Sequence, residues 1–180
     1  MMQRAPQAPP MDIRQDDLSS PQTQALLRLH LAGMHETSPP GHVFALDLSG
    51  LTAPGVTVWS AWSGSDICGI GALKQLDDRT GEVKSMRTHP DHLRRGAAAK
   101  LLDTVIAHAR ALGLTRLSLE TGSGAAFEPA LALYRRRGFV DGGPFSDYED
   151  SGFSQFLHLD LAADAPLAQV RPSPSSPFTK

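Results

Sequence analysis

Residues 82–120 constrain the fold more than any other part of the sequence, because they read as strand, helix and strand in succession. The segment EVKSMRT (82–88) has the pattern of a strand and ends just before a proline. A helix is predicted from Arg95 to Leu112, ended by Gly113, and LTRLSLE (114–120) is a second strand. Two strands joined by a helical crossover lie parallel in one sheet, so the sequence predicts an α/β fold.

The segments on either side of this unit extend the sheet. Alternating β-branched and aromatic residues around a Ser-Gly-Ser-Asp turn predict a β-hairpin over 56–76. The other predicted elements are a strand at 12–18, a helix from Ser20–Pro21 to near Gly33, a short helix at 42–48, a helix between Pro129 and Gly138, and strands at 139–140 and 153–159. Together they predict a mixed sheet, an antiparallel meander followed by a central parallel βαβ pair.

The composition fits one globular domain. With 180 residues, of which 41% are hydrophobic and 20% charged, the chain can bury a sizeable core without a metal or a disulfide. We expect this domain to span residues 11–161. Residues 1–10 and 162–180 are rich in Pro, Ala, Ser and Gln, and we expect them to be disordered tails.

Charge and cysteine content limit the environment and the partners. Cys68 is the single cysteine, and neither a signal segment nor an apolar run of membrane-spanning length is recognisable, so we expect a cytoplasmic protein that binds no membrane. The formal net charge of -2 gives no overall attraction to nucleic acid. The histidines lack the spacing of a metal site, so no metal is expected.

The predicted start of the long helix has the character of an anion site. HLRRGAAAKLL (92–102) places Arg94 and Arg95 before Gly96 and the alanines 97–99. The first turn of a helix carries unpaired N–H groups, and small side chains let a phosphate approach them. Small residues also let a helix pack tightly on a sheet, and surface arginines are often only solvated. Spacing alone leaves both interpretations open, and neither a Walker loop nor a dinucleotide-binding fingerprint is present.

Two motifs, in the right order, match the pattern of one enzyme family. Residues 93–98 follow Q/R-x-x-G-x-G/A after its first position and come directly after a strand and a turn. ALALYRRRGF (130–139) follows A-x-x-L-Y-x-x-x-G-F throughout, one strand and loop further on. These motifs resemble the GNAT superfamily of acetyl-coenzyme A dependent N-acetyltransferases. The run from 59 to 148 looks like the YsnE-like branch, so the resemblance covers most of residues 12–160.

The resemblance implies the GNAT acyl-CoA N-acyltransferase fold, in which the central parallel pair splays apart at the cofactor. It implies cofactor contacts from the strand before the loop, from the loop itself and from the last helix. The residues implied are Met86, Arg87, Thr88, Leu93, Arg94, Arg95, Gly96, Ala97, Ala98, Ala99 and Tyr134. Two positions depart from the family pattern, since Leu93 replaces a Gln or Arg and Phe127 stands where many members have an Asn.

Acetyl transfer to an amine needs a deprotonated amine and a proton for the leaving thiolate. Tyr134 matches the position whose hydroxyl, in the family, reaches the cofactor sulfur as general acid; a core aromatic is the alternative. Glu82 opens the strand where histone-type members carry their general base. It alternatively faces solvent or pairs with Lys84, and Glu120 at the end of the adjacent strand is the rival carboxylate.

The resemblance does not identify the acceptor amine. The candidate acceptor-binding residues are His35, His42, Arg87, Glu120, Asp147 and Tyr148. Arg87 is suited to bind an acceptor carboxylate as a bidentate fork or to pair with Glu120. His35 and His42 border the loop HETSPPG, which covers the acceptor in this fold. Asp147 and Tyr148 close its other side or form a polar turn.

The sequence therefore predicts an acetyl-CoA-dependent acyltransferase. We expect an acetyl group to pass from acetyl-CoA to a primary amine of a small molecule or amino acid, directly within a ternary complex. Cys68 lies within a strand and far in sequence from the phosphate loop, so no acetyl-enzyme is expected. The alternatives are a protein acetyltransferase and a non-catalytic acyl-CoA-binding module. A homodimer formed through the sheets is a further possibility.

Overall fold

The computed structural model of the protein describes residues 9–162. The strands are β1 (Met11–Gln15), β2 (Val56–Ser63), β3 (Asp66–Gln75), β4 (Thr80–Thr88), β5 (Arg116–Thr121), β6 (Val140–Gly142) and β7 (Gln155–Asp160). The helices are α1 (Pro21–Thr37), α2 (Leu48–Leu51), α3 (Ala97–Ala111) and α4 (Glu128–Arg136), with 3-10 turns at Pro90–His92 and Ala125–Phe127. Each predicted element, apart from the helix at 42–48, has its counterpart within these bounds.

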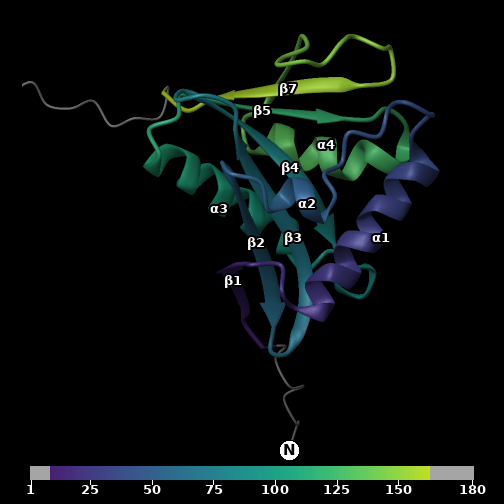
Figure 1. Cartoon of the computed structure of the whole chain (residues 1–180), viewed down its shortest axis with the longest axis vertical. Coiled ribbons are helices and arrows are strands. Elements are labelled where there is room, and N and C mark those ends of the chain that lie inside the picture. The colour runs from purple at the N-terminus through teal and green to yellow at the C-terminus, as the bar shows by residue number, and fades with distance from the viewer. Residues whose placement is uncertain (1–8, 163–180) are drawn as a thin grey trace, which may run out of the picture.

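The strands form one mixed sheet in the order β1-β2-β3-β4-β5-β7-β6. Pairing is antiparallel from β1 to β4 and from β5 through β7 to β6, and among the described strands only β4 and β5 pair in parallel. α1 and α2 cover one face of the sheet, and α3 and α4 cover the other (Figure 1). The predicted antiparallel meander followed by a parallel βαβ pair is confirmed.

Each face of the sheet is closed by an apolar core. α3 buries residues at helical spacing, including Leu101, Leu102 and Val105, against the sheet and α4. On the opposite face, Leu26 and Leu27 of α1 pack with residues of β2 and β3. This apolar burial holds both helical layers against the sheet, and the sheet positions the polar residues described below.

The parallel pair comes apart soon after it begins. β4 and β5 are in register only over Thr80–Glu82 of β4, although β4 continues to Thr88. Figure 1 shows β5 and β7 crossing the top of the view at a steep angle to β2 and β3. Beyond Glu82, the edge of β4 that faces β5 therefore has no strand partner within residues 9–162, and the expected splay is confirmed.

A β-bulge in β4 decides which side chains face α1. Ser85 and Met86 together lie opposite the single residue Gly71, and Ser85 has a left-handed φ of 56°. Without the extra residue, strand alternation would turn Arg87 towards α3. The bulge instead places Arg87 on the α1 face, which it shares with Lys84.

α1 is longer than the sequence predicts. The predicted end near Gly33 is wrong, because the helix continues to Thr37. A β-carbon at Gly33 would lie 3.2 Å from Nη1 of Arg87, so this glycine makes room for a side chain from β4. The helix ends where Ser38, the residue before Pro39, takes extended backbone angles.

The predicted short helix at 42–48 is also wrong. Residues 42–47 have no regular secondary structure, and α2 begins only at Leu48. Asp47 caps α2, since its Oδ1 accepts a hydrogen bond from the backbone N–H of Gly50 at 2.9 Å. The apolar residues that suggested a longer helix are half-buried in an irregular segment, 42–46.

Most of the predicted tails lie outside the described residues, since only 9, 10 and 162 belong to the described part of the chain. The tails and the domain limits at 11 and 161 therefore stay predictions. Between residues 9 and 162, no helix has the length and apolar character needed to cross a membrane.

Candidate active site

The turn before α3 presents the backbone amides that the sequence predicts. Arg94 and Gly96 have left-handed φ values of 61° and 85°, and Lys100 N–H donates to the Gly96 carbonyl at 3.0 Å. The N–H groups of residues 97–99 precede this bond and have no acceptor within the helix. A β-carbon at Gly96 would meet no atom within 4 Å, so this side of the turn is open to an anion.

The side chains of this loop differ in burial. Leu93 is 59% exposed, and Arg94 and Arg95 are exposed as well. Ala97, in contrast, is 1% exposed and belongs to the core beneath α3. The small residues therefore pack the helix against the sheet and also leave the amides accessible, so the two interpretations of this stretch are compatible.

The free edge of β4 lies beside the splay. Met86 turns towards α3, where its Sδ would lie 2.6 Å from a β-carbon at Gly71, and Thr88 is half-buried. The backbone of β4 pairs with β3 on one side, but after Glu82 it has no strand partner on the other. Such an edge can bind the amide groups of an extended ligand as it would bind an added strand.

Tyr134 projects from α4 into the core beneath the splayed strands. Its side chain is 7% exposed, and its ring packs edge-on against Phe139 at 5.8 Å. Its hydroxyl makes no hydrogen bond to another described residue. Burial raises the pKa of Tyr134, so the hydroxyl is protonated at neutral pH and available as a proton donor.

Glu82, Lys84 and Tyr148 form a closed hydrogen-bonded cluster on the α1 face. Lys84 Nζ lies 3.0 Å from Oε1 of Glu82, and the Tyr148 hydroxyl donates to the same oxygen at 2.5 Å. Lys84 Nζ also donates to the Tyr148 oxygen at 2.9 Å. Burial, followed by the charge of Glu82, raises the pKa of Tyr148. The pairing of Glu82 with Lys84, one of the alternatives from the sequence, is therefore present.

Glu120 lies across the splay from this cluster. Glu82 is in register with Ser118, so Glu120, two residues further along β5, is level with Lys84. Glu120 is half-buried, and this burial raises the pKa of its carboxyl, while the nearby Ser154 hydroxyl and the charge of Lys84 oppose the rise. A carboxylate with a raised pKa accepts protons more readily than one held in an ion pair.

Arg87 extends across the same face towards α1. Its Nε is buried without a hydrogen-bond partner, and so are Nδ1 of His30 and Oγ of Ser85. His30 is 7% exposed, and burial, followed by the positive charges of Arg87 and Lys84, lowers its pKa to about 4. His30 is therefore neutral at pH 7.

Known proteins are similar to this chain in sequence and in fold. Residues 21–139 match the Acetyltransferase (GNAT) family. The chain belongs to the GNAT family. The uncharacterized N-acetyltransferase YedL of Escherichia coli is 48% identical over 155 residues, which cover 86% of this chain and 98% of that protein. The uncharacterized N-acetyltransferase YsnE of Bacillus subtilis is 48% identical over 151 residues, covering 84% of this chain and all of that protein.

Solved GNAT structures share the fold. The crystal structure of a Klebsiella pneumoniae protein named as an acyl-CoA N-acyltransferase has a TM-score of 0.71 and 28% identity, covering 84% of this chain and 97% of that one. The Salmonella typhimurium protein yncA, solved with its cofactor acetyl-CoA, has a TM-score of 0.64 and 19% identity, covering 84% and 94%. The GNAT fold and the acyltransferase class expected from the sequence are confirmed.

The structure brings together some of the candidate acceptor residues and not others. Arg87, Glu120 and Tyr148 share the α1 face of the sheet with Glu82. His42 lies in the segment above them, with a buried, unpartnered Nδ1 and its ring centre 5.8 Å from that of Phe153.

Two candidates lie elsewhere. His35 in the last turn of α1 and Asp147 in the loop before β7 are exposed. The alternative ion pair between Arg87 and Glu120 does not form in the described part of the chain. Within residues 9–162, no group of three or more His, Cys, Asp or Glu side chains is arranged to hold a metal ion.

A cavity of about 490 Å³ lies on the α1 face of the sheet but away from these residues. Its lining includes Thr80, Arg116, Ser118 and His158, near the start of β4 and β5. None of the predicted site residues lines it. This cavity is therefore not formed by the residues expected to bind the acceptor.

Sequence reasoning missed two of the residues that shape this GNAT site. His30 follows Thr23, Leu26 and Leu27 on the buried face of α1, so a polar residue at an apolar position of the helical pattern was available as a signal. Ser85 carries the bulge, and nothing in the residues 82–88 marks its left-handed backbone. Because the sequence does not reveal the bulge, it could not predict that Arg87 and Glu82 share one face of the sheet.

We predict that acidification destabilises the protein partly through His30. The folded pKa of about 4 is below the unfolded value near 6.5, so the unfolded chain binds the proton first and stability falls as the pH drops through this window. The expected loss between pH 7 and pH 5 is about 2 kcal/mol. Urea unfolding of His30→Gln at both pH values should show a smaller loss than the wild type, whereas the exposed His35→Gln should behave as wild type.

Proposed function

We propose that the protein transfers the acetyl group of acetyl-CoA directly to the primary amine of a small molecule within a ternary complex. The observation that carries this proposal is the splay between β4 and β5. The amides of residues 97–99, at the start of α3, and Tyr134, on α4, belong to the side of the sheet that these two helices cover. Glu120 and Arg87 lie on the opposite, α1 side of the sheet. A donor and an acceptor can therefore meet at one opening from different sides.

The donor half of the site has the groups that coenzyme A requires. The amides of residues 97–99, at the positive end of α3, are suited to the pyrophosphate, and the exposed Arg94 and Arg95 add positive charge. The unpaired edge of β4 is suited to the amides of the pantetheine arm. Leu93 contributes no polar side chain to the anion site. The backbone amides of the loop do not depend on which side chain stands at position 93, so they remain available to the anion.

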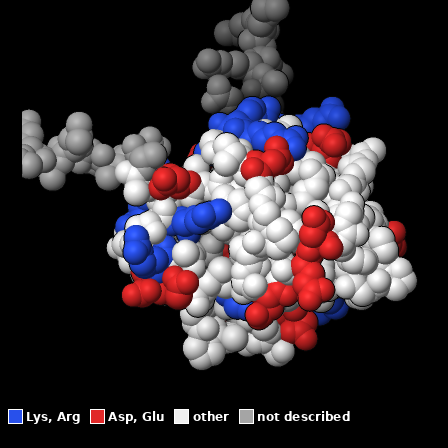
Figure 2. All heavy atoms as spheres, turned by 90° about the horizontal axis from the view of Figure 1, so that it is seen from above, with Lys and Arg blue, Asp and Glu red and all other residues white. Residues whose placement is uncertain are grey.

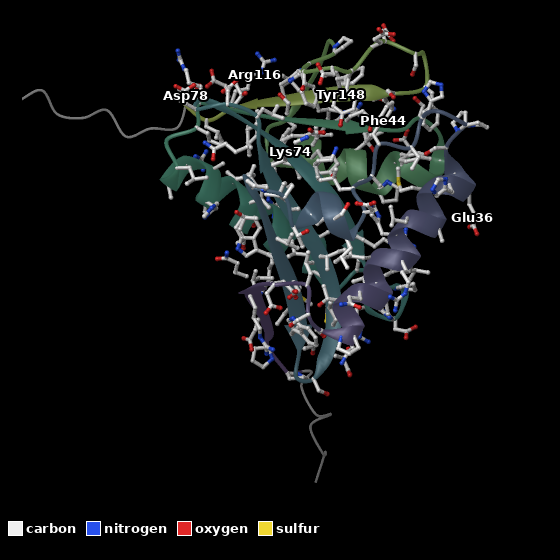
Figure 3. All side chains as sticks on the ribbon, in the orientation of Figure 1. Glu36, Phe44, Lys74, Asp78, Arg116 and Tyr148 are labelled. Carbon is white, nitrogen blue, oxygen red and sulfur yellow. The ribbon has the colours of Figure 1, made fainter. Side chains whose placement is uncertain are left out.

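Aromatic contacts over the acceptor side support a small acceptor. Phe44, from the segment 42–46, packs edge-on against Tyr148 at 5.1 Å between ring centres, and Figure 3 shows these two side chains close together. Phe145 packs against the other side of Tyr148 at 5.0 Å. Two loops thus meet above the α1 face, which restricts access by a bulky protein chain.

The charge distribution on the surface favours a small-molecule acceptor over a nucleic acid. Figure 2 shows basic and acidic side chains around a largely uncharged area, with no continuous basic strip on the face in view. A nucleic-acid ligand would need such a strip. Acetylation of a protein is a second possible outcome of the assays below, and the cytoplasmic location and the homodimer stay predictions.

The reaction needs one proton acceptor and one proton donor. The amine nitrogen attacks the thioester carbonyl, a C–N bond forms and the C–S bond breaks. We assign Glu120 as the group that takes the proton of the amine, because its pKa is raised by burial. Tyr134 supplies a proton to the departing sulfur. Glu82, held by Lys84 and Tyr148, has the role of positioning these two side chains.

We predict that a carboxylate at the start of α3 abolishes cofactor binding. Ala98→Glu adds a negative charge beside the amides of residues 97–99 and repels a pyrophosphate, whereas in the free protein it favours the helix terminus. Saturating acetyl-CoA should raise the thermal midpoint of the wild type by about 5–10 °C and that of Ala98→Glu hardly at all. Ala107→Glu, at an exposed position of the same helix, is the matched control and should respond as wild type.

We predict that Tyr134→Phe lowers kcat by about 10²–10⁴-fold, the range for loss of a general acid. The ring keeps its packing against Phe139, so stability and the response to acetyl-CoA should change little. Thiol release with a reactive amine is the measurement. An unchanged kcat in a rate-limiting chemical step would exclude Tyr134 as the proton donor, and it would leave the core-aromatic interpretation.

We predict that Glu120 sets the acidic limb of the pH profile of kcat/KM. The base works only when it is deprotonated. Because the pKa of Glu120 is raised, activity should begin to fall at a higher pH, as the solution is made more acidic, than it would with an ordinary glutamate as the base. Glu120→Gln should remove this limb and lower the rate, while Glu82→Gln should keep the limb. The reverse result, with the limb lost only in Glu82→Gln, would make Glu82 the base, as the sequence suggested.

A further inference from the structure

The charge of Arg87 on the α1 face has no counter-charge in the part of the chain that the structure describes. Arg87 has no carboxylate within salt-bridge distance, and its Nε is buried without a hydrogen-bond partner. The neighbouring Lys84 is already paired with Glu82 at 3.0 Å. A cation that loses hydration without gaining a partner is costly to a folded protein. An anion that binds beside Arg87 would supply the missing counter-charge.

A neutral polar side chain, that of His30, accompanies this charge. His30 is 7% exposed, and its Nδ1 is buried without a hydrogen-bond partner. His30 faces the charges of Arg87 and Lys84 and stays neutral at pH 7, so it adds no second positive charge. One guanidinium with a neutral hydrogen-bonding side chain suits an anion of single charge, and the planar fork matches a carboxylate.

α1 is adapted to hold the guanidinium in place. A β-carbon at Gly33 would lie 3.2 Å from Nη1 and 3.6 Å from Nη2 of Arg87. Glycine weakens a helix interior relative to alanine, yet the helix runs through Gly33 to Thr37. The absence of a side chain at Gly33 therefore accommodates the guanidinium of Arg87, although it does not stabilise the helix.

We propose that Arg87 binds a carboxylate of the acceptor, which is therefore an amino acid or a similar amino carboxylate. This inference rests on the proposed function. Arg87 is three residues beyond Lys84 on β4, which at about 3.3 Å per residue is at most roughly 10 Å from the level of Glu120. An amino acid whose carboxylate is bound by Arg87 can direct its amine towards Glu120. Glu82 lies further from Arg87 along β4 than the level of Glu120 does.

The test compares acceptors that differ only in the carboxylate. A panel of L-amino acids and the corresponding L-amino acid amides is assayed by thiol release from acetyl-CoA. The wild type should prefer its best free amino acid over the matching amide by about 100-fold in kcat/KM. Arg87→Gln should remove this preference, because it should lower kcat/KM far more for the amino acid than for the amide. Arg87→Lys should give an intermediate preference, because it keeps the charge and loses the fork.

A second variant perturbs the pocket without removing the arginine. Gly33→Ala adds a methyl group next to Nη1, so it should raise KM for the free amino acid while leaving kcat, and the kinetics of the amide, as in the wild type. The thermal midpoint should stay equal or rise, since alanine favours the helix. This variant therefore separates carboxylate binding from a purely structural role of Arg87.

Three results would contradict the inference. Equal use of amides and amino acids by the wild type, with Arg87→Gln lowering both alike, overturns the carboxylate assignment and leaves acetyl transfer intact. A loss in Arg87→Gln of the thermal stabilisation by acetyl-CoA would assign the charge to the cofactor instead. Acetyl-CoA binding without thiol release for any amine would overturn the proposed function itself, and this inference with it.

Discussion

The rest of the site depends on how briefly β4 and β5 pair. Their parallel contact covers only Thr80–Glu82, after which the two central strands diverge while apolar cores hold both helical layers in place. This divergence leaves one edge of β4 without a strand partner, and in the proposed reaction donor and acceptor meet there from the α3 side and the α1 side. The amides before α3 and the polar residues facing α1 could not otherwise serve one reaction, because a continuous sheet would separate them.

Charge balance then distinguishes residues that look alike in the sequence. Two glutamates flank the splay, but Glu82 is held by a lysine and a phenol, while Glu120 is half-buried without such a partner. Lys84 and Arg87 lie on the same face, and of these two Lys84 is paired with a carboxylate. In a weakly hydrated region such differences decide protonation and binding. The unmatched members of each pair are the ones suited to contact the acceptor.

The sequence was sufficient for the fold and for the donor half of the site, because both follow from local patterns. Strand alternation, helix periodicity and the small residues 96–99 at a helix start are short-range signals. The acceptor half depends on contacts between distant segments. The approach of Tyr148 to Glu82 spans 66 positions, and the bulge at Ser85 shifts the face of Arg87 without any local mark. The segment in which a helix was expected, 42–48, likewise contacts a distant part of the chain, since His42 and Phe44 pack against rings of the loop before β7.

Gly33 and Arg87 form a pair matched in size across α1 and β4. A larger residue at position 33 crowds the end of a long side chain at position 87, so we expect the two positions to vary together. Their joint occurrence is a compact signature that can be read from sequence alone. Under the proposal above, it offers a way to sort GNAT relatives by whether the acceptor that they acetylate carries a carboxylate, even where the sequences of the cofactor loops are alike.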